Sequence, residues 1–208
     1  DRLVFTHRLG DEEGVECLKA ESGERIWSYR YPTRYKDRYG FGDGPRCGPV
    51  IDGGHVYTYG AEGKLHCLNL SDGRVVWKRN VSAAYKVPRE FFGVGSSPLV
   101  EGALLIVNVG APGGPCVVAF DKKTGEEKWR AGDQWGASYA SPIPADINEK
   151  RTVYVFAGGD SRPPTGGLLA IDPQSGVIFS RFSFRSGKYE SVNAARPTVV
   201  GHQGFISA

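Results

Sequence analysis

The side chains that most often catalyse reactions or bind metals are sparse in this sequence. Its four cysteines include no Cys-x-x-Cys or adjacent pair, and its four histidines occur in different segments. No Gly-x-Ser-x-Gly, His-Glu-x-x-His or P-loop segment is present, so the common hydrolase, zinc-protease and nucleotidase mechanisms lack support. We expect Cys17 and Cys67 to be small buried residues and Cys47 and Cys116 to lie on strands.

Basic and aromatic side chains are the remaining candidates, and they gather in the segments 31–47, 79–95, 131–141 and 183–197. The summed charge of these segments exceeds the formal net charge of +3 of the whole chain. Arginine forks onto carboxylates and phosphates and stacks on aromatic rings, so these segments could bind an anionic ligand, a glycan or an extended peptide. Alternatively, the rings pack the segments onto the fold and the arginines face water. The candidate binding residues are Arg46, Arg89, Phe92, Trp135, Tyr139, Asn193 and Arg196.

The elements that must position these residues come from an internal repeat. A glycine recurs with a period of about fifty residues. A small residue precedes each glycine by six positions, and a tryptophan follows the first three glycines by four positions. The residues concerned are Gly23, Gly73, Gly125 and Gly176, with Trp27, Trp77 and Trp129, and with Ser180 in place of a fourth tryptophan.

A second pattern falls between these copies and completes a unit of four strands. It consists of a proline step, a short apolar run, a polar turn and a β-branched or aromatic run, as in CGPVIDGGHVYTYG from Cys47. Radially repeated four-stranded antiparallel units form a β-propeller, whose neighbouring blades cover each other's apolar faces. We therefore predict an all-β propeller. Its tryptophans should be largely buried between blades, each near a turn and a small residue of a neighbouring repeat.

The fullest copy of the repeat is AFDKKTGEEKW, which begins at Ala119. Its Ala119, Asp121, Thr124, Gly125 and Trp129 resemble the tryptophan-docking motif of the pyrroloquinoline-quinone-type propellers. These families include quinoprotein alcohol dehydrogenases, BamB-like assembly proteins and secreted propellers often labelled polyvinyl-alcohol dehydrogenase-like. The resemblance covers essentially the whole chain and implies a PQQ-like repeat fold, part of an eight-bladed ring.

The phase of the repeat predicts how the blades divide the chain. Residues 1–30 supply the last three strands of one blade, and 45–80, 95–131 and 139–183 supply one blade each. Residues 195–208 supply the first two strands of a further blade. We expect the remainder of the ring to lie in the same or another chain, and exposed strand edges to favour association.

The repeats explain nearly every recurring residue without leaving a catalytic group over. We therefore predict a non-catalytic binding or assembly scaffold that needs no cofactor. Its binding face would be the set of long inter-blade loops around the propeller channel. Arg46 and Arg196 should lie at the rim of this channel, because each is close to the proline that begins an inner strand.

Two other functions remain open. The resemblance allows an alcohol dehydrogenase that depends on pyrroloquinoline quinone (PQQ) and calcium, with Glu90, Asp133 and Asn193 as candidate oxygen ligands. Such dehydrogenases resemble one another in an adjacent-cysteine disulfide, which this sequence lacks. The third function is carbohydrate binding, with Trp135 and Tyr139 as a stacking platform.

Charge and hydropathy limit the partners. The small net charge supplies no global field that would favour nucleic acid, so we expect a protein or peptide partner, or an anionic or carbohydrate ligand.

The longest uncharged stretch, 102–120, is interrupted by Asn108, prolines and glycines, and it predicts two strands and a turn in place of a transmembrane segment. The chain begins with Asp1 and has no methionine, so we expect any signal peptide to be absent from it. The resemblance implies an extracytoplasmic location, periplasmic or secreted.

Overall fold

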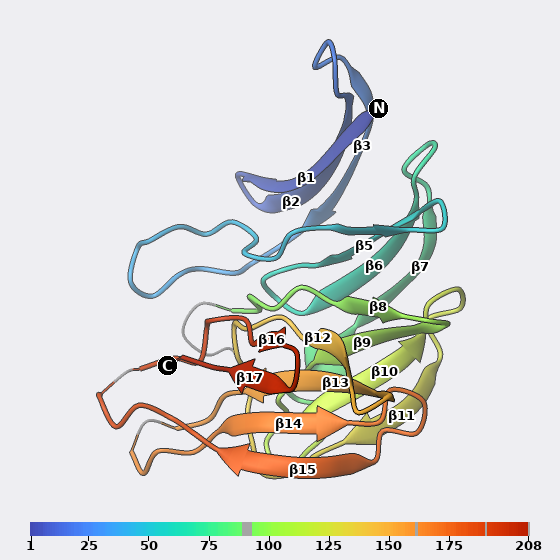
Figure 1. Ribbon diagram of the computed structural model, residues 1–208. Coiled ribbons are helices and arrows are strands. Elements are labelled where there is room, and N and C mark those ends of the chain that lie inside the picture. Colours follow the sequence, from blue (N-terminus) through green and yellow to red (C-terminus); the bar gives the residue numbers. More distant parts are fainter. Residues whose placement is uncertain (89–92, 161, 190, 208) are drawn as a thin grey trace.

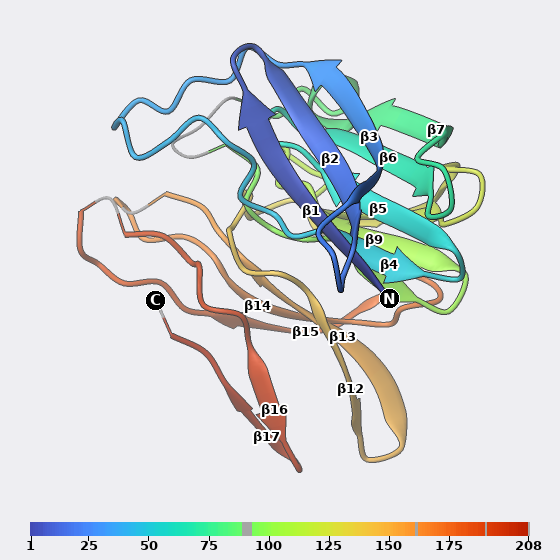
Figure 2. The same cartoon turned by 90° about the horizontal axis from the view of Figure 1, so that it is seen from above.

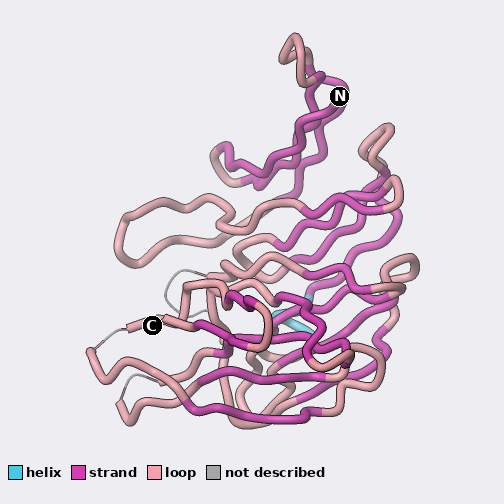
Figure 3. Tube along the Cα trace, viewed as in Figure 1, coloured by secondary structure: helices cyan, strands magenta, loops and turns pink. Residues whose placement is uncertain are grey.

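The chain folds into a succession of antiparallel sheets (Figure 1). The computed structural model describes all residues except 89–92, 161, 190 and 208. Within the described part, a single short helix, α1 (Val81–Ala84), accompanies the strands (Figure 3). The strands are β1 (Arg2–Leu9), β2 (Glu12–Lys19), β3 (Arg25–Pro32), β4 (Val50–Asp52), β5 (His55–Tyr59), β6 (Lys64–Asn69), β7 (Val75–Asn80), β8 (Leu99–Glu101), β9 (Leu104–Asn108), β10 (Val117–Asp121), β11 (Glu127–Ala131), β12 (Ile143–Ile147), β13 (Lys150–Ala157), β14 (Gly167–Ile171), β15 (Ile178–Ser183), β16 (Thr198–Val200) and β17 (Gln203–Phe205).

Strand order within each sheet follows chain order, so every sheet is a simple meander. The sheets are β1–β3, β4–β7, β8–β11, β12–β15 and β16–β17, and the middle three have four strands each. They lie one after another from the blue to the red end of the chain, and the view from above shows them splayed (Figures 1 and 2). This is the blade arrangement of a β-propeller, as the repeat predicted.

Both faces of the sheet β8–β11 are apolar, because alternate residues of its strands pack against different neighbouring sheets. Leu105 and Val118 belong to a core shared with β4–β7. Their chain neighbours Ile106 and Val117 belong to a core shared with β12–β15. A sheet with two apolar faces needs a sheet on each side, and stacking of the blades meets that requirement.

Each repeated tryptophan lies on the glycine turn of the next blade. The indole N–H groups of Trp27, Trp77 and Trp129 donate to the backbone oxygens of Leu70, Lys122 and Pro173, at 2.9, 3.0 and 2.9 Å. The rings cover the turn glycines so closely that an added Cβ atom would lie 2.6 to 2.7 Å from the indole. These glycines also have φ between +72° and +76°, so the turn needs glycine for two reasons. They are Gly73, Gly125 and Gly176.

The predicted small residue lies elsewhere than expected. Cys67 is the cross-strand partner of Trp77 within the same sheet, and not a residue of the neighbouring repeat. The same holds for Cys17 opposite Trp27 and for Ala119 opposite Trp129. The small side chain therefore makes room for the indole beside it in its own blade. In the fourth copy, Ser180 on β15 is exposed.

A buried carboxylate joins the first two blades. Glu13 on β2 accepts a hydrogen bond of 2.7 Å from the Tyr31 hydroxyl and one of 3.0 Å from the backbone N–H of Ala61 in the next sheet. Tyr31 in turn lies against the ring of His66, with ring centroids 4.3 Å apart. Burial, followed by the charge of Glu13, raises the pKa of the Tyr31 hydroxyl, which therefore stays protonated as a donor.

Candidate functional site

The long connections between blades gather on one side of the molecule, on the left in Figure 1. These connections are the β3–β4 loop (33–49), the β7–β8 loop (81–98), the β11–β12 loop (132–142) and the β15–β16 loop (184–197), and we call their side the long-loop face. The turns at the opposite ends of the sheets are short. Loops carried on a rigid scaffold are where binding groups most often lie, so the long-loop face is the candidate site.

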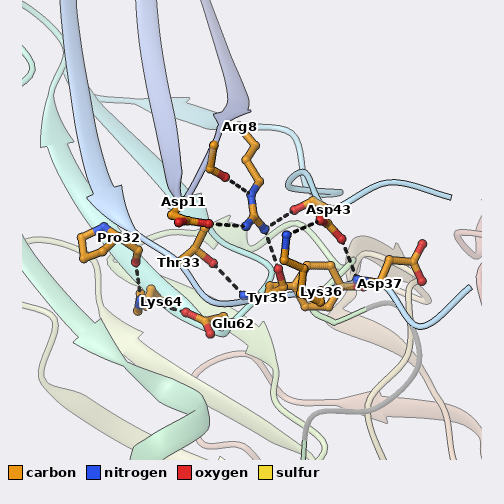
Figure 4. Close-up of polar contacts among 11 residues, drawn as sticks. Arg8, Asp11, Pro32, Thr33, Tyr35, Lys36, Asp37, Asp43, Glu62 and Lys64 are labelled. Carbon is orange, nitrogen blue, oxygen red and sulfur yellow. Dashed lines mark hydrogen bonds and ion pairs between the residues drawn. The ribbon is translucent and has the colours of Figure 1, made fainter. Parts of the chain in front are cut away.

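The β3–β4 loop is held in place by Arg8 on β1 (Figure 4). The Arg8 guanidinium donates to the backbone oxygens of Tyr35 at 2.6 Å, Asp43 at 2.8 Å and Gly10 at 2.8 Å. Its side chain is nearly buried. One arginine thus fixes both limbs of the loop through backbone atoms.

Asp37 organises the tip of the same loop. Its carboxylate accepts hydrogen bonds from the backbone N–H groups of Tyr39, Phe41 and Gly42, at 3.0, 2.8 and 3.2 Å. It also accepts one of 3.1 Å from the Arg46 guanidinium. These contacts, first that with the Tyr39 amide, hold the pKa of the Asp37 carboxyl below its ordinary value. The carboxylate is ionised at neutral pH and is turned into the loop.

Asp43 completes this arrangement, since its carboxylate accepts from the Asp37 backbone N–H at 2.8 Å and from the Lys36 ammonium at 3.1 Å. Arg46, which we predicted to be at the channel rim as an anion-binding group, also donates to the Gly42 oxygen at 2.9 Å. Its guanidinium is therefore engaged within the loop. These two hydrogen bonds of Arg46 stabilise the conformation of the β3–β4 loop.

The β11–β12 and β15–β16 loops bring two predicted site residues together. The Tyr139 backbone N–H donates to the Asn193 backbone oxygen at 3.0 Å. The buried Asn193 side chain donates through Nδ2 to the Ala157 oxygen at 2.8 Å. Trp135 is partly buried against the core between the third and fourth blades, and Arg196 is exposed next to Pro197. The predictions for Arg89 and Phe92, and for Glu90, fall outside the described residues.

A cavity of about 60 Å³ lies between these loops and the second and third blades. Tyr35, Glu62, Asn108, Ser138 and Tyr139 contribute to its lining. Asn108 donates through Nδ2 to the Ser138 hydroxyl at 2.8 Å, whereas its buried Oδ1 finds no hydrogen-bond partner among the described residues. The cavity therefore offers an acceptor to a small donor such as water.

Sequence reasoning missed Arg8, Asn108 and Ser138. Arg8 looks like one charge among many on a strand, and its partners are backbone oxygens, which any sequence has. Asn108 carried a usable signal, because it is an amide inside the buried run LLIVNV. A buried amide needs partners, and in this chain it finds Ser138 across 30 positions.

The thiols of the described chain are structural. All four cysteines are free and buried, as expected for Cys17 and Cys67. Burial raises the pKa of Cys116 to about 12 and that of Cys67 to about 12, so these thiols stay protonated and unreactive. The expectation that Cys47 and Cys116 lie on strands was wrong, because Cys47 lies in the β3–β4 loop and Cys116 directly precedes β10.

Two of the candidate calcium ligands of the quinone alternative, Asp133 and Asn193, lie among the described residues and differ in their surroundings. Asp133 is solvent-facing, with its Oδ1 4.0 Å from an Arg181 nitrogen. Asn193 is buried and bonded to Ala157. Ca²⁺ needs several oxygen ligands that converge on one point, and these two side chains lie in different environments. In the described part of the chain, no group of three or more His, Cys, Asp or Glu side chains could hold a metal ion.

No helix among the described residues is long and apolar enough to cross a membrane.

The chain's similarity to known proteins covers almost its whole length. The family described as outer membrane protein assembly factor BamB matches residues 11–208.

Individual relatives fall into two functional groups. The quinohemoprotein alcohol dehydrogenase of Comamonas testosteroni is 30% identical over 234 positions, which cover 89% of this chain and 32% of that protein. The outer membrane protein assembly factor BamB of Burkholderia pseudomallei is 29% identical over 198 positions, which cover 92% of this chain and 45% of that protein. The chain thus spans from about a third to less than half of the length of these curated relatives.

Solved structures show the same fold. The Comamonas testosteroni dehydrogenase superposes with a TM-score of 0.64 at 19% identity, over 95% of this chain and 37% of that one. BamB from Moraxella catarrhalis superposes with a TM-score of 0.59 at 17% identity, over 89% of this chain and 51% of that one. Both likenesses support the propeller architecture.

Proposed function

This chain belongs to the family described as outer membrane protein assembly factor BamB, and we propose that it acts as a binding or assembly scaffold for other proteins. The partner would bind at the long-loop face through Trp135, Tyr139 and Arg196, and the buried Asn193 would hold the β15–β16 loop in shape beneath them. Arg46 would contribute by holding the β3–β4 loop in shape. Arg89 and Phe92 remain predicted members of this face from their places in the sequence.

The observation that carries the proposal is that side chains fix the backbone of the long loops. Arg8 bonds two backbone oxygens of the β3–β4 loop, and Asp37 bonds three of its backbone amides. Asn193 ties the β15–β16 loop to the end of β13. A surface whose shape is set before binding loses less conformational entropy when a partner docks. Such loops suit recognition of another protein.

Site-directed photo-crosslinking in cells that produce the protein natively tests the proposal. A photoreactive residue would replace Trp135 or Arg196 on the long-loop face. The matched controls would replace Lys123 or Gln174, which are exposed on the opposite turns. We expect both long-loop positions to capture one and the same protein and the controls to capture none. Equal capture from both faces, or none from the long-loop face, would contradict the proposal.

The identity to the Comamonas testosteroni enzyme favours a second candidate, a quinone-dependent alcohol dehydrogenase. In that case the chain would bind PQQ and calcium, which would supply the redox chemistry. The protein should then retain quinone absorbance after gel filtration with PQQ and Ca²⁺, and should reduce a dye in the presence of an alcohol. The scaffold proposal expects neither result.

We further infer an extracytoplasmic location. Support comes from the family description, which names an outer membrane protein assembly factor. Fractionation of cells that produce the protein natively should recover it outside the cytoplasm. Recovery with a cytoplasmic marker enzyme would contradict this inference.

A further inference from the structure

The first limb of the β3–β4 loop has two unlike sides. Thr33 and Tyr35 are buried, and the side chain of Asp37 is 0% exposed. The residues between and after them, Arg34, Lys36 and Arg38, are exposed. This alternation is that of an extended chain, in which successive side chains point to opposite sides. The limb therefore carries a row of three exposed cations, of which Lys36 is ion-paired with Asp43 at 3.1 Å.

Two aromatic rings follow this row at the tip of the loop. Tyr39 is 45% exposed and Phe41 is 76% exposed. Their ring centroids are 6.3 Å apart with an angle of 28° between the ring planes, so the rings are stacked. The amides of both residues are held by Asp37. The rings are thus presented by an ordered turn at the end of a loop that projects from the blades (Figure 1).

The carboxylates of the loop offset only part of this charge. Asp37 is turned inward onto backbone amides and Arg46. Asp43 accepts from the Asp37 amide and from Lys36, whose side chain is still 72% exposed. Figure 4 shows the contacts of Asp43 with Lys36 and with the Asp37 backbone. The exposed groups of the limb and tip are therefore Arg34, Arg38, the Lys36–Asp43 pair and the two aromatic rings.

We propose that the tip of the β3–β4 loop, residues 34–41, binds the surface of an anionic lipid membrane. Aromatic rings favour the interface between water and hydrocarbon, and nearby lysine and arginine side chains are attracted to anionic headgroups. One such signal alone binds weakly, and the combination of an apolar and a basic signal is the usual requirement for stable membrane association. The loop carries both signals within one short segment.

The shape of the tip favours a lipid surface over a protein groove. A specific protein interface buries about 800 Å² on each partner and uses about 20 to 30 residues. The tip is a short, projecting segment and offers far less area than that. A fluid headgroup layer can accept a small convex tip without a preformed pocket. This lipid contact does not depend on the proposed function, because it needs no protein partner.

Vesicle sedimentation tests the proposal with the full chain. The probe would be vesicles of phosphatidylglycerol mixed equally with phosphatidylcholine, and the comparison would be vesicles of phosphatidylcholine alone. We expect binding to the anionic vesicles that weakens with added salt, and little binding to the neutral ones. Since each cation near such a surface contributes about a fivefold gain in affinity, replacing Arg34 and Arg38 together by Gln should weaken binding about 25-fold.

The aromatic part has its own variant and control. Replacing Tyr39 and Phe41 by Ala should weaken binding to anionic vesicles at least tenfold, since both exposed rings are removed. The matched controls are Phe205→Ala and Lys123→Gln, which remove an exposed ring and an exposed cation outside the loop and should change nothing. Circular dichroism melting should show that all variants fold.

Three results would overturn the proposal. One is the absence of binding to anionic vesicles, and another is an equal loss in the control variants. The third is binding of soluble polyglutamate as tight as that of vesicles and unaffected by loss of the two rings, which would identify an acidic polypeptide as the ligand. Failure of the crosslinking experiment above would leave the lipid proposal intact, because the vesicles contain no protein.

Discussion

Trp77→Ala measures what the contact between neighbouring blades contributes to stability. The indole is 9% exposed, packs on Gly125 of the next blade and donates a hydrogen bond of 3.0 Å to the Lys122 oxygen. An aromatic side chain buries about 150 to 250 Å², which at about 25 cal/mol per Å² corresponds to about 4 to 6 kcal/mol. Alanine keeps part of this burial and the surroundings relax, so we expect a loss of about 3 to 5 kcal/mol.

Urea unfolding followed by circular dichroism measures this loss as a lower midpoint. The matched control is Val76→Ala on the same strand, where the side chain is exposed. A surface change of that kind should alter the free energy of unfolding by no more than about 0.5 kcal/mol. If Trp77→Ala shifted the midpoint no further than Val76→Ala does, the indole would not hold the blades together and the packing argument would fail.

Three further predictions concern the same chain. Burial, followed by the charges of Lys78 and Lys64, lowers the pKa of His66 to about 4. Because an unfolded histidine titrates near pH 6.5, stability should be full above about pH 6.5 and fall by about 2 to 3 kcal/mol towards pH 4. The urea midpoint of His66→Gln should fall less between pH 6.5 and pH 4 than that of the unaltered protein. An equal fall with pH in both proteins would contradict the prediction. Gly125→Ala should cost about 1 to 3 kcal/mol in the urea assay, because φ is +72° and the new Cβ would lie 2.7 Å from the indole that packs on it. Arg8→Ala removes three hydrogen bonds from the β3–β4 loop and its base, each worth about 1 kcal/mol, so trypsin should cleave that loop at least about tenfold faster, and an unchanged rate would show that Arg8 does not brace it.

The blades could be predicted from the sequence because the first three repeats contain the same pair of residues, a tryptophan and a turn glycine, at the same spacing. A large ring at Trp77 needs a partner without a side chain, and Gly125 of the next repeat meets that need. The period of about fifty residues fixes which glycine serves which tryptophan. The position of the small residue was predicted less well. Spacing along the chain does not say whether Cys67 faces Trp77 across a strand pair or across two blades, and the register decides this.

The long loops could not be predicted in the same way, because their shape depends on contacts that carry no sequence signature. Arg8 lies far along the chain from Tyr35 and Asp43, and it bonds their backbone oxygens. Arg46 was expected to be available to a ligand. In the structure its guanidinium donates a hydrogen bond to the carboxylate of Asp37, nine positions earlier. A count of charges in the segment cannot distinguish a carboxylate that faces water from one that is used to order a turn.

That distinction determines what the long-loop face can bind. In the β3–β4 loop the Asp37 carboxylate is turned inward, whereas Arg34, Lys36 and Arg38 are exposed, so the surface of the limb is more positive than the sequence of the segment suggests. The alternation in TRYKDR contains this pattern, and the burial of the Tyr35 side chain in the structure shows which of the alternating residues face the protein. The blade residues serve mutual packing and offer little to a ligand. The loops, whose order comes from a few inward-facing polar side chains, therefore determine which surface this propeller recognises.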